Sequence, residues 1–125
     1  EYMGKEVQTI LNLLSEGIVV EGDIRTTKDI RIDGTLVGTV QTNGRLVLGP
    51  ASKVTGGVNS PSIDIYGQVE GDIVSTGSIV LRKDSKIKGT ITTRTMIVEA
   101  GATFNGESKM LAGKEKSELP SGGEK

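Results

Sequence analysis

The strongest constraint on the fold is a short motif, apolar-x-Gly-x-apolar, that recurs six times between Ile18 and Ser108. The central glycines are 16, 18, 15, 18 and 17 residues apart, so the chain repeats about every 17 residues. A fixed period of this length predicts a solenoid, in which each repeat packs mainly on its neighbours. The copies are Val20-Glu-Gly22-Asp-Ile24, Leu36-Val-Gly38-Thr-Val40, Val54-Thr-Gly56-Gly-Val58, Val69-Glu-Gly71-Asp-Ile73, Ile87-Lys-Gly89-Thr-Ile91 and Phe104-Asn-Gly106-Glu-Ser108. The sixth copy is degenerate, because it ends in a serine in place of an apolar residue.

A second motif, apolar-x-apolar, lies between successive glycine motifs. Alternation with period two predicts very short strands that point one face inward and one outward. Turn residues such as Asp33-Gly34, Asn43-Gly44 and Gly49-Pro50 separate the strands. The sequence therefore predicts an all-β, single-domain parallel β-helix of about six windings. The second motif reads Ile30-Arg-Ile32, Leu46-Val-Leu48, Ile63-Asp-Ile65, Ile79-Val-Leu81 and Met96-Ile-Val98.

The alternation also predicts which side chains fill the interior of the solenoid. Aromatic residues are 2% of the chain, which favours a narrow interior filled by valine, isoleucine and leucine. The expected inward residues are Ile18, Val20, Ile24, Ile30, Ile32, Leu36, Val40, Leu46, Leu48, Val54, Val58, Ile63, Ile65, Val69, Ile73, Ile79, Leu81, Ile87, Ile91, Met96, Val98 and Phe104.

The repeated glycine allows two structural explanations. It could be a turn residue with positive φ, but its place between two inward residues favours a bend or a close backbone approach within a strand. Stacking would then align the six glycines in a ladder along one edge. A phosphate-binding loop is disfavoured, because the chain has no GxGxxG or GxxxxGK[ST] motif.

Composition excludes several functional classes. The chain has no histidine and no cysteine, so it lacks the commonest general base, the commonest zinc ligands and any disulfide. Lysine and arginine number 15 against 16 acidic residues, which gives no electrostatic reason to expect a nucleic-acid partner. Carboxylate pairs such as Glu70 and Asp72 are ordinary on a solvated edge. We therefore expect no catalytic residues, no metal and no cofactor.

The two ends of the solenoid carry the main functional expectation. Terminal windings expose unpaired backbone groups and a cross-section of the core, so a soluble solenoid needs caps. No capping helix is recognisable after the last winding. The chain is therefore expected to stack on another copy of itself through an interface formed by Ile18, Val20, Ile24, Met96, Val98, Phe104 and Met110.

The two termini differ in composition from the repeats. Residues 17–110 are expected to form the β-helix, and residues 111–125, rich in Lys, Glu, Ser and Gly, a disordered tail. Residues 1–16 are expected to be flexible or a short helix, because four apolar residues fall at i, i+3, i+4 and i+7. That segment would either contact a membrane or cover the first winding as a helix or irregular strand. Its candidate membrane contacts are Val7, Ile10, Leu11, Leu13 and Leu14.

The motifs together resemble the bactofilins, the polymer-forming bacterial cytoskeletal proteins. The resemblance covers about residues 15–110 and rests on the glycine motifs, on Ile30-Arg-Ile32-Asp-Gly34 and on the stretch from Val98 to Gly106. It implies a right-handed β-helix of triangular cross-section whose copies join end to end into nucleotide-independent, non-polar filaments. It also implies a cytoplasmic protein bound peripherally at the inner membrane, with the last winding around Phe104 in the polymer contact and the N-terminal tail on the lipid.

Two other functions remain open at this point. One is a non-polymerising adaptor that binds other proteins, such as cell-envelope proteins, on its sides. The other, disfavoured because the chain has no histidine, is an acyltransferase of the hexapeptide-repeat type. The docking face of the adaptor would use Arg25, Lys28, Arg31, Arg82, Lys83, Lys86 and Lys88.

Overall fold

The computed structural model describes residues 12–111 and consists of strands joined by short turns. Each long strand of the first windings contains one glycine motif, and each short strand after β1 contains one apolar-x-apolar motif. The strands are β1 (Asn12–Leu14), β2 (Val19–Thr26), β3 (Ile30–Ile32), β4 (Thr35–Thr42), β5 (Arg45–Leu48), β6 (Lys53–Asn59), β7 (Ser62–Ile65), β8 (Gln68–Leu81), β9 (Lys86–Val98) and β10 (Thr103–Met110).

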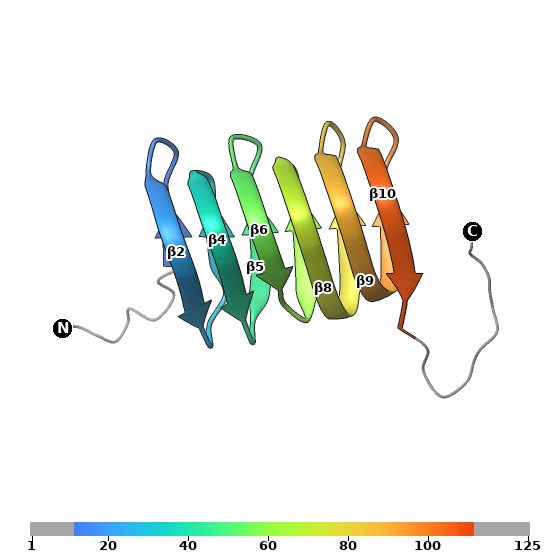
Figure 1. The fold of residues 1–125 in the computed structure, drawn as a ribbon, viewed down its shortest axis with the longest axis horizontal. Helices are drawn as coiled ribbons and strands as arrows, with labels where there is room; N and C mark the ends of the chain where they lie inside the picture. Colours follow the sequence, from blue (N-terminus) through green and yellow to red (C-terminus); the bar gives the residue numbers. More distant parts are fainter. Residues whose placement is uncertain (1–11, 112–125) are drawn as a thin grey trace.

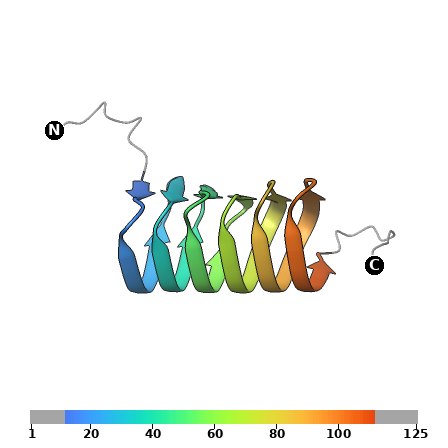
Figure 2. The ribbon, with the colours of Figure 1, turned by 90° about the horizontal axis from the view of Figure 1, so that it is seen from above.

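The strands form a parallel β-solenoid of about six windings, as expected. Every pairing is parallel, and each strand lies beside its equivalent in the next winding. β8 and β9 each run continuously through a long and a short segment, with one irregularity between Ser75 and Ser78. Figures 1 and 2 show the windings stacked side by side along the long axis, with the N-terminal and C-terminal windings at opposite ends.

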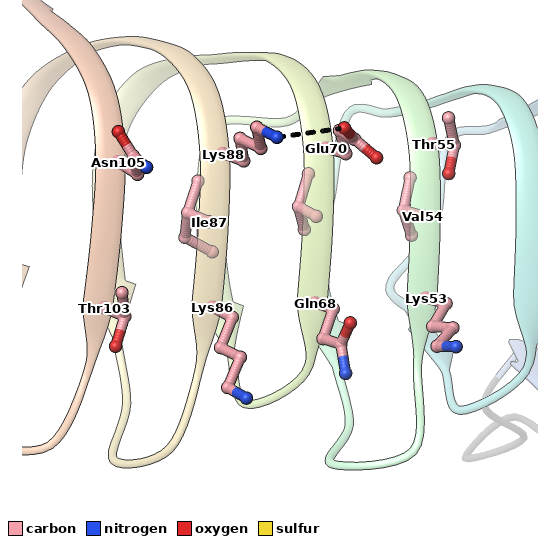
Figure 3. A pocket seen from close by; sticks show the side chains of 11 residues that line it. Lys53, Val54, Thr55, Gln68, Glu70, Lys86, Ile87, Lys88, Thr103 and Asn105 are labelled. Atoms are coloured by element: carbon pink, nitrogen blue, oxygen red, sulfur yellow. Dashed lines mark ion pairs between the residues drawn. The ribbon is translucent and has the colours of Figure 1, made fainter.

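Each winding has three sides. The first side lies before the motif glycine, the second lies after it, and the short strand makes the third. In Figure 3 the ribbon turns over just beyond Lys88 and Glu70, which directly precede Gly89 and Gly71. The motif glycine is therefore a corner of the cross-section.

The motif glycines form the expected ladder. Gly22, Gly38, Gly56, Gly71, Gly89 and Gly106 are paired in successive windings and have φ between +135° and +152°. From Gly38 onward, a Cβ at each of them would overlap the carbonyl oxygen of the preceding glycine. Positive φ and close backbone approach, treated above as alternatives, therefore act at the same residue.

The core is a set of stacked aliphatic columns. Sixteen hydrophobic side chains are at most 7% exposed, and all sixteen belong to the expected inward set. Val20, Ile24, Met96 and Phe104, also in that set, pack against the core but are only partly buried.

Two residues of the inward set, Ile18 and Val98, are exposed, so the prediction of burial was wrong for them. Ile18 is 43% exposed and Val98 is 51% exposed. Val98 occupies the same column as fully buried Leu81, but no further winding of the described chain covers it. Ile18 lies at a corner where it precedes the first long strand. Both residues belong to end windings, where an inward direction does not suffice for burial.

A second corner is held by buried hydroxyl groups that the sequence analysis did not predict. Thr42, Ser60, Ser75 and Thr93 occupy equivalent positions and are at most 2% exposed. Their hydroxyls donate to backbone carbonyls of a neighbouring turn, as Ser60 does to Gly44 at 2.9 Å. Because these hydrogen bonds pair the carbonyl groups of the turn, the turn can be buried without the free-energy penalty of unpaired polar atoms.

The solenoid begins earlier than residue 17. Residues 12–14 form β1, which pairs in parallel with Ile30–Ile32 of β3. The expected tail boundary at residue 16 and the helical interpretation are therefore wrong for these three residues, because pairing with β3 holds them extended. The other residues of both predicted tails, 1–11 and 112–125, lie outside the described residues.

Candidate polymerisation surfaces

The N-terminal end of the solenoid presents open strand edges. Within residues 12–111, β1 pairs with β3 alone and β2 with β4 alone. One edge of each strand therefore carries backbone N–H and C=O groups with no strand beside them. Around these edges Val19 is 64% exposed and Leu13 is 56% exposed, while Val20 and Ile24 are half-buried. The end is therefore a strand template with apolar side chains.

The C-terminal end has the same character. β10 pairs with β9, and the 95–98 segment of β9 pairs with β8, on one side only among the described strands. Val98, Ile97 and Met110 are 51%, 51% and 53% exposed, and Phe104 is partly buried against the core. Phe104 stacks in register on Ile87, which is 1% exposed. Phe104 therefore packs on the core from one side, and no further winding of the described chain covers its other side.

The structure places all seven predicted interface residues in the end windings. Ile18, Val20 and Ile24 lie in the first winding, while Met96, Val98, Phe104 and Met110 lie in the last two. The two groups are at opposite ends of the long axis (Figure 1). They form two separate surfaces, so no single chain can bring them together.

Three exposed apolar residues at these ends, Leu13, Val19 and Ile97, were not predicted as part of the polymerisation interface, although Leu13 was predicted as a membrane contact. All three point outward along their strands, whereas the repeated motifs identify inward residues. A signal was present, because each is an apolar residue directly beside an inward position of an end winding.

The predicted membrane contacts do not share one face in the described chain. Leu13 points outward and Leu14 packs against the core, as neighbours in a strand do. The helical face that would have joined Leu14 to the apolar residues before it therefore does not reach residue 14. Val7, Ile10 and Leu11 lie outside the described residues. No helix within residues 12–111 is long and apolar enough to cross a membrane.

The basic residues proposed for an adaptor face do not share a side either. Arg31 and Arg82 lie on the short-strand side, where carboxylates bind them. Lys86 and Lys88 lie before the motif glycine of β9, and Arg25 lies after that of β2. Lys28 and Lys83 lie in turns. The predicted docking face is therefore dispersed over all three sides.

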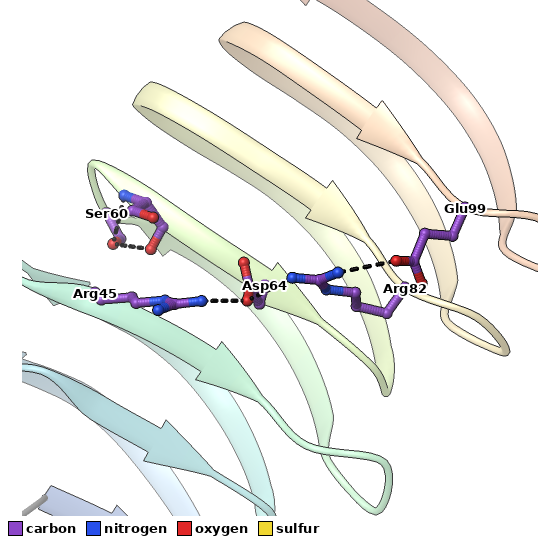
Figure 4. Close-up of polar contacts among 6 residues, drawn as sticks. Arg45, Ser60, Asp64, Arg82 and Glu99 are labelled. Carbon is purple, nitrogen blue, oxygen red and sulfur yellow. Dashed lines mark hydrogen bonds and ion pairs between the residues drawn. The ribbon is translucent and has the colours of Figure 1, made fainter.

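A chain of ion pairs runs along the short-strand side, across several windings (Figure 4). Arg45 Nη2 donates to Asp64 Oδ2 at 2.6 Å, and Arg82 Nη2 donates to the same oxygen at 3.2 Å. Arg82 Nη1 donates to Glu99 Oε2 at 2.9 Å, and its guanidinium lies 5.8 Å from the ring centroid of Tyr66. The hydrogen bond from Arg82 is the main cause that lowers the pKa of Glu99.

A shallow open groove of about 460 Å³ lies on the side that precedes the motif glycine (Figure 3). Its lining mixes lysines with amide and hydroxyl side chains, and Lys88 lies 4.0 Å from Glu70. Residues 12–111 contain no group of three or more acidic side chains that could hold a metal.

The comparisons with known proteins agree with this architecture. The family model Bactofilin, described as polymer-forming cytoskeletal, matches residues 12–109. A solved structure, the cryo-EM reconstruction of Thermus thermophilus bactofilin double helical filaments, is 34% identical with a TM-score of 0.74. The match covers 78% of this chain and 96% of the Thermus chain. No curated protein matches the chain.

The family match places this parallel β-solenoid with open ends in the polymer-forming cytoskeletal class. The chain belongs to the bactofilin family. This is a structural family, and the expectation of a self-associating scaffold is confirmed at this level.

Proposed function

We propose that the chain assembles end to end, through its first and last windings, into filaments that need no nucleotide. The observation that carries this proposal is the pair of open ends. Three interface residues, Ile18, Val98 and Met110, are 43–53% exposed, and the other four are only partly buried, while their column neighbours in the interior windings are almost fully buried. Stacking another winding on either end would pair the free strand edge and cover apolar surface. Neither gain involves a phosphate or a bound nucleotide.

The proposed filament is non-polar, so each end meets its like. Open edges of parallel strands can accept a partner strand in either direction, which permits contacts between two first windings and between two last windings. The Thermus relative forms double helical filaments. By analogy with it, we propose that filaments of this chain also associate in pairs.

The decisive experiment blocks one end at a time. Phe104→Arg places a charge in the open last winding and should abolish filaments of purified, nucleotide-free protein under the electron microscope. In a non-polar filament the variant should still form dimers through its first winding, whereas a polar filament would leave monomers. Light scattering after size exclusion separates these two results.

Asn105→Arg is the matched control. It adds the same charge one residue away on β10, at an exposed outward position, and should leave filaments intact. If filaments still form in Phe104→Arg, the last winding is not part of the contact between chains. A discrete monomer of the unmodified chain at physiological salt would instead favour an adaptor that does not polymerise.

We propose that the N-terminal residues hold these filaments at the inner face of the membrane, in the cytoplasm. The apolar residues Val7, Ile10 and Leu11 support this proposal. In a liposome co-sedimentation assay the full chain should pellet with the liposomes, and a version that lacks residues 1–11 should stay in the supernatant. The deletion ends there because β1 belongs to the solenoid. Equal binding by the two versions would dismiss the role of this segment.

A further inference from the structure

The three sides of the solenoid differ in their charged residues. The short-strand side comprises residues 12–14, 29–33, 45–49, 62–66, 78–82 and 95–99, and it contains no lysine. Three of the five arginines in the described chain, Arg31, Arg45 and Arg82, lie on it, together with Tyr66. The lysines of the described chain lie in turns or on the other two sides, at Lys28, Lys53, Lys83, Lys86, Lys88 and Lys109.

The outward column of the short-strand side is also the most apolar one. It reads Leu13, Arg31, Val47, Asp64, Val80 and Ile97; Leu13 and Ile97 are 56% and 51% exposed, and Val47 and Val80 are half-buried. By contrast, the outward column that begins the first side reads Val19, Thr35, Lys53, Gln68, Lys86 and Thr103. Surfaces that bind other proteins are enriched in Arg and aromatic residues and depleted in Lys. The short-strand side shares these three features, and it also contains four acidic residues.

The charges on the short-strand side alternate from winding to winding. Asp29, Arg31 and Asp33 sum to −1 in the first winding. The next windings carry Arg45 (+1), Asp64 (−1), Arg82 (+1) and Glu99 (−1). From residues 29–33 to residues 95–99 the order of net charge is −, +, −, +, −, which reads the same in both directions, while residues 12–14 carry no charge. The charge of the middle winding lies beneath the surface, because the side chain of Asp64 is 7% exposed. An identical side, displaced by one winding or about 4.8 Å, would set windings of opposite net charge against each other whether the two copies run parallel or antiparallel.

We propose that the short-strand side is the lateral interface between two filaments of this chain, which rests on the proposed end-to-end assembly and pairing. A second copy fits because it has the same axial period and the complementary charge order. An anionic membrane fits poorly, because the side has no lysine and carries four acidic residues against three arginines.

The size of this side makes pairing depend on polymerisation. Five windings at about 4.8 Å and five residues at about 3.3 Å give about 400 Å² per chain. A stable contact between two proteins needs about 800 Å² on each partner. Two isolated chains therefore fall short, but chains joined end to end present several such areas at once, and their contacts add. Blocking the ends should abolish lateral pairing as well.

The test is the double variant Val47→Lys with Val80→Lys, which adds two lysines to the outward column of the short-strand side. Negative-stain microscopy should show filaments of undiminished length that are single instead of paired. The matched control, Val37→Lys with Val74→Lys, adds two lysines to outward positions of the other sides and should leave pairs intact. Circular dichroism melting checks that both variants fold, and the single variant Val47→Lys replaces the double variant if it melts early.

Salt supplies an independent measurement on the unmodified chain. Raising salt from about 0.05 to about 0.5 M shortens the screening length several-fold, so pairs should separate while single filaments persist. Pairs that survive Val47→Lys with Val80→Lys, or that are lost equally in the control, would overturn the lateral assignment and leave end-to-end assembly standing. Single filaments of the unmodified chain would overturn it too, whereas an unmodified chain that forms no filaments would contradict the proposed function itself.

Discussion

The interior windings and the end windings use the same columns of residues with opposite results. Leu81 and Val98 are register partners, yet the exposed fraction rises from 0% to 51% between them. Ile87 and Phe104 differ in the same direction, from 1% exposed to partly buried. The difference teaches that burial in this protein depends on the number of neighbouring windings more than on the residue itself. A partner chain can therefore complete an end winding by supplying one more neighbour.

The largest effect should come from breaking the glycine ladder in an interior winding. In Gly71→Ala the new Cβ would overlap the carbonyl oxygen of Gly56, at a φ of +142°. Strained backbone combined with a backbone clash should lower the free energy of unfolding by about 4 kcal/mol or more. Denaturant unfolding or the yield of folded protein measures this loss.

Gly22→Ala sharpens the comparison at the N-terminal end. Its φ is +136°, but nothing within the described chain lies within 4 Å of the new Cβ. The cost within one chain should be strain alone, about 1–3 kcal/mol. Filament assembly should fall more steeply, because the Cβ points toward the place where a partner winding would stack. Normal filaments of a folded Gly22→Ala protein would contradict close stacking at that end.

The next prediction compares the truncation of two side chains that occupy the same column of the core. Leu81→Ala removes a fully buried side chain and should cost about 2–5 kcal/mol of unfolding free energy. Val98→Ala, one winding further, should cost less than about 1 kcal/mol, because half of that side chain already contacts water. Both are measured by urea unfolding in the Phe104→Arg background. Equal losses would mean that the last winding is already covered in the monomer.

A smaller effect should result from Asp64→Asn. The side chain of Asp64 is 7% exposed between Arg45 and Arg82, so the neutral amide would leave two guanidinium groups without their shared carboxylate. We expect the free energy of unfolding to fall by about 1–2 kcal/mol. The loss is not larger because Arg45 is half exposed, so water screens its interaction with the carboxylate. Asp72→Asn, at an exposed position of β8, is the control and should change the melting temperature little.

The smallest effect concerns pH. Hydrogen bonds from Arg82 and from the backbone N–H of Lys83 lower the pKa of Glu99. A lowered folded-state pKa gives stability that is present above the usual glutamate pKa and is lost as pH falls through the folded value. The melting temperature of the unmodified chain should therefore exceed that of Glu99→Gln at about pH 6, and the difference should shrink as pH falls below the usual glutamate pKa. A constant difference would contradict the Arg82 contact.

Much of the fold could be predicted from the sequence because each winding repeats the same local sequence pattern. Alternation assigns inward residues, and the glycine period fixes which residues become register neighbours, as in the Gly56 and Gly71 pair. The positions of the seven interface residues at the two ends also followed from the repeat. Their part in assembly stays a prediction.

The remaining features depend on contacts that a local pattern does not contain. Residues 12–14 are too few to distinguish a helical from an alternating period, and pairing with β3 decides between them. The exposure of Val98 depends on whether another winding covers the last one. A signal for the ion-pair chain was present, because its partners are 19, 18 and 17 residues apart, close to one repeat.

The direction of the strand pairing has a mechanical consequence. The backbone hydrogen bonds run between windings, along the axis that Figures 1 and 2 show horizontally. Tension on a filament would therefore pull all the bonds of one winding at once, and successive windings would carry the same load in series. Such a fibre breaks at the boundary with the fewest bonds. In the proposed end-to-end filament, a junction with fewer hydrogen bonds than an interior boundary would set the tensile strength, and the interior windings would stay folded when it parts.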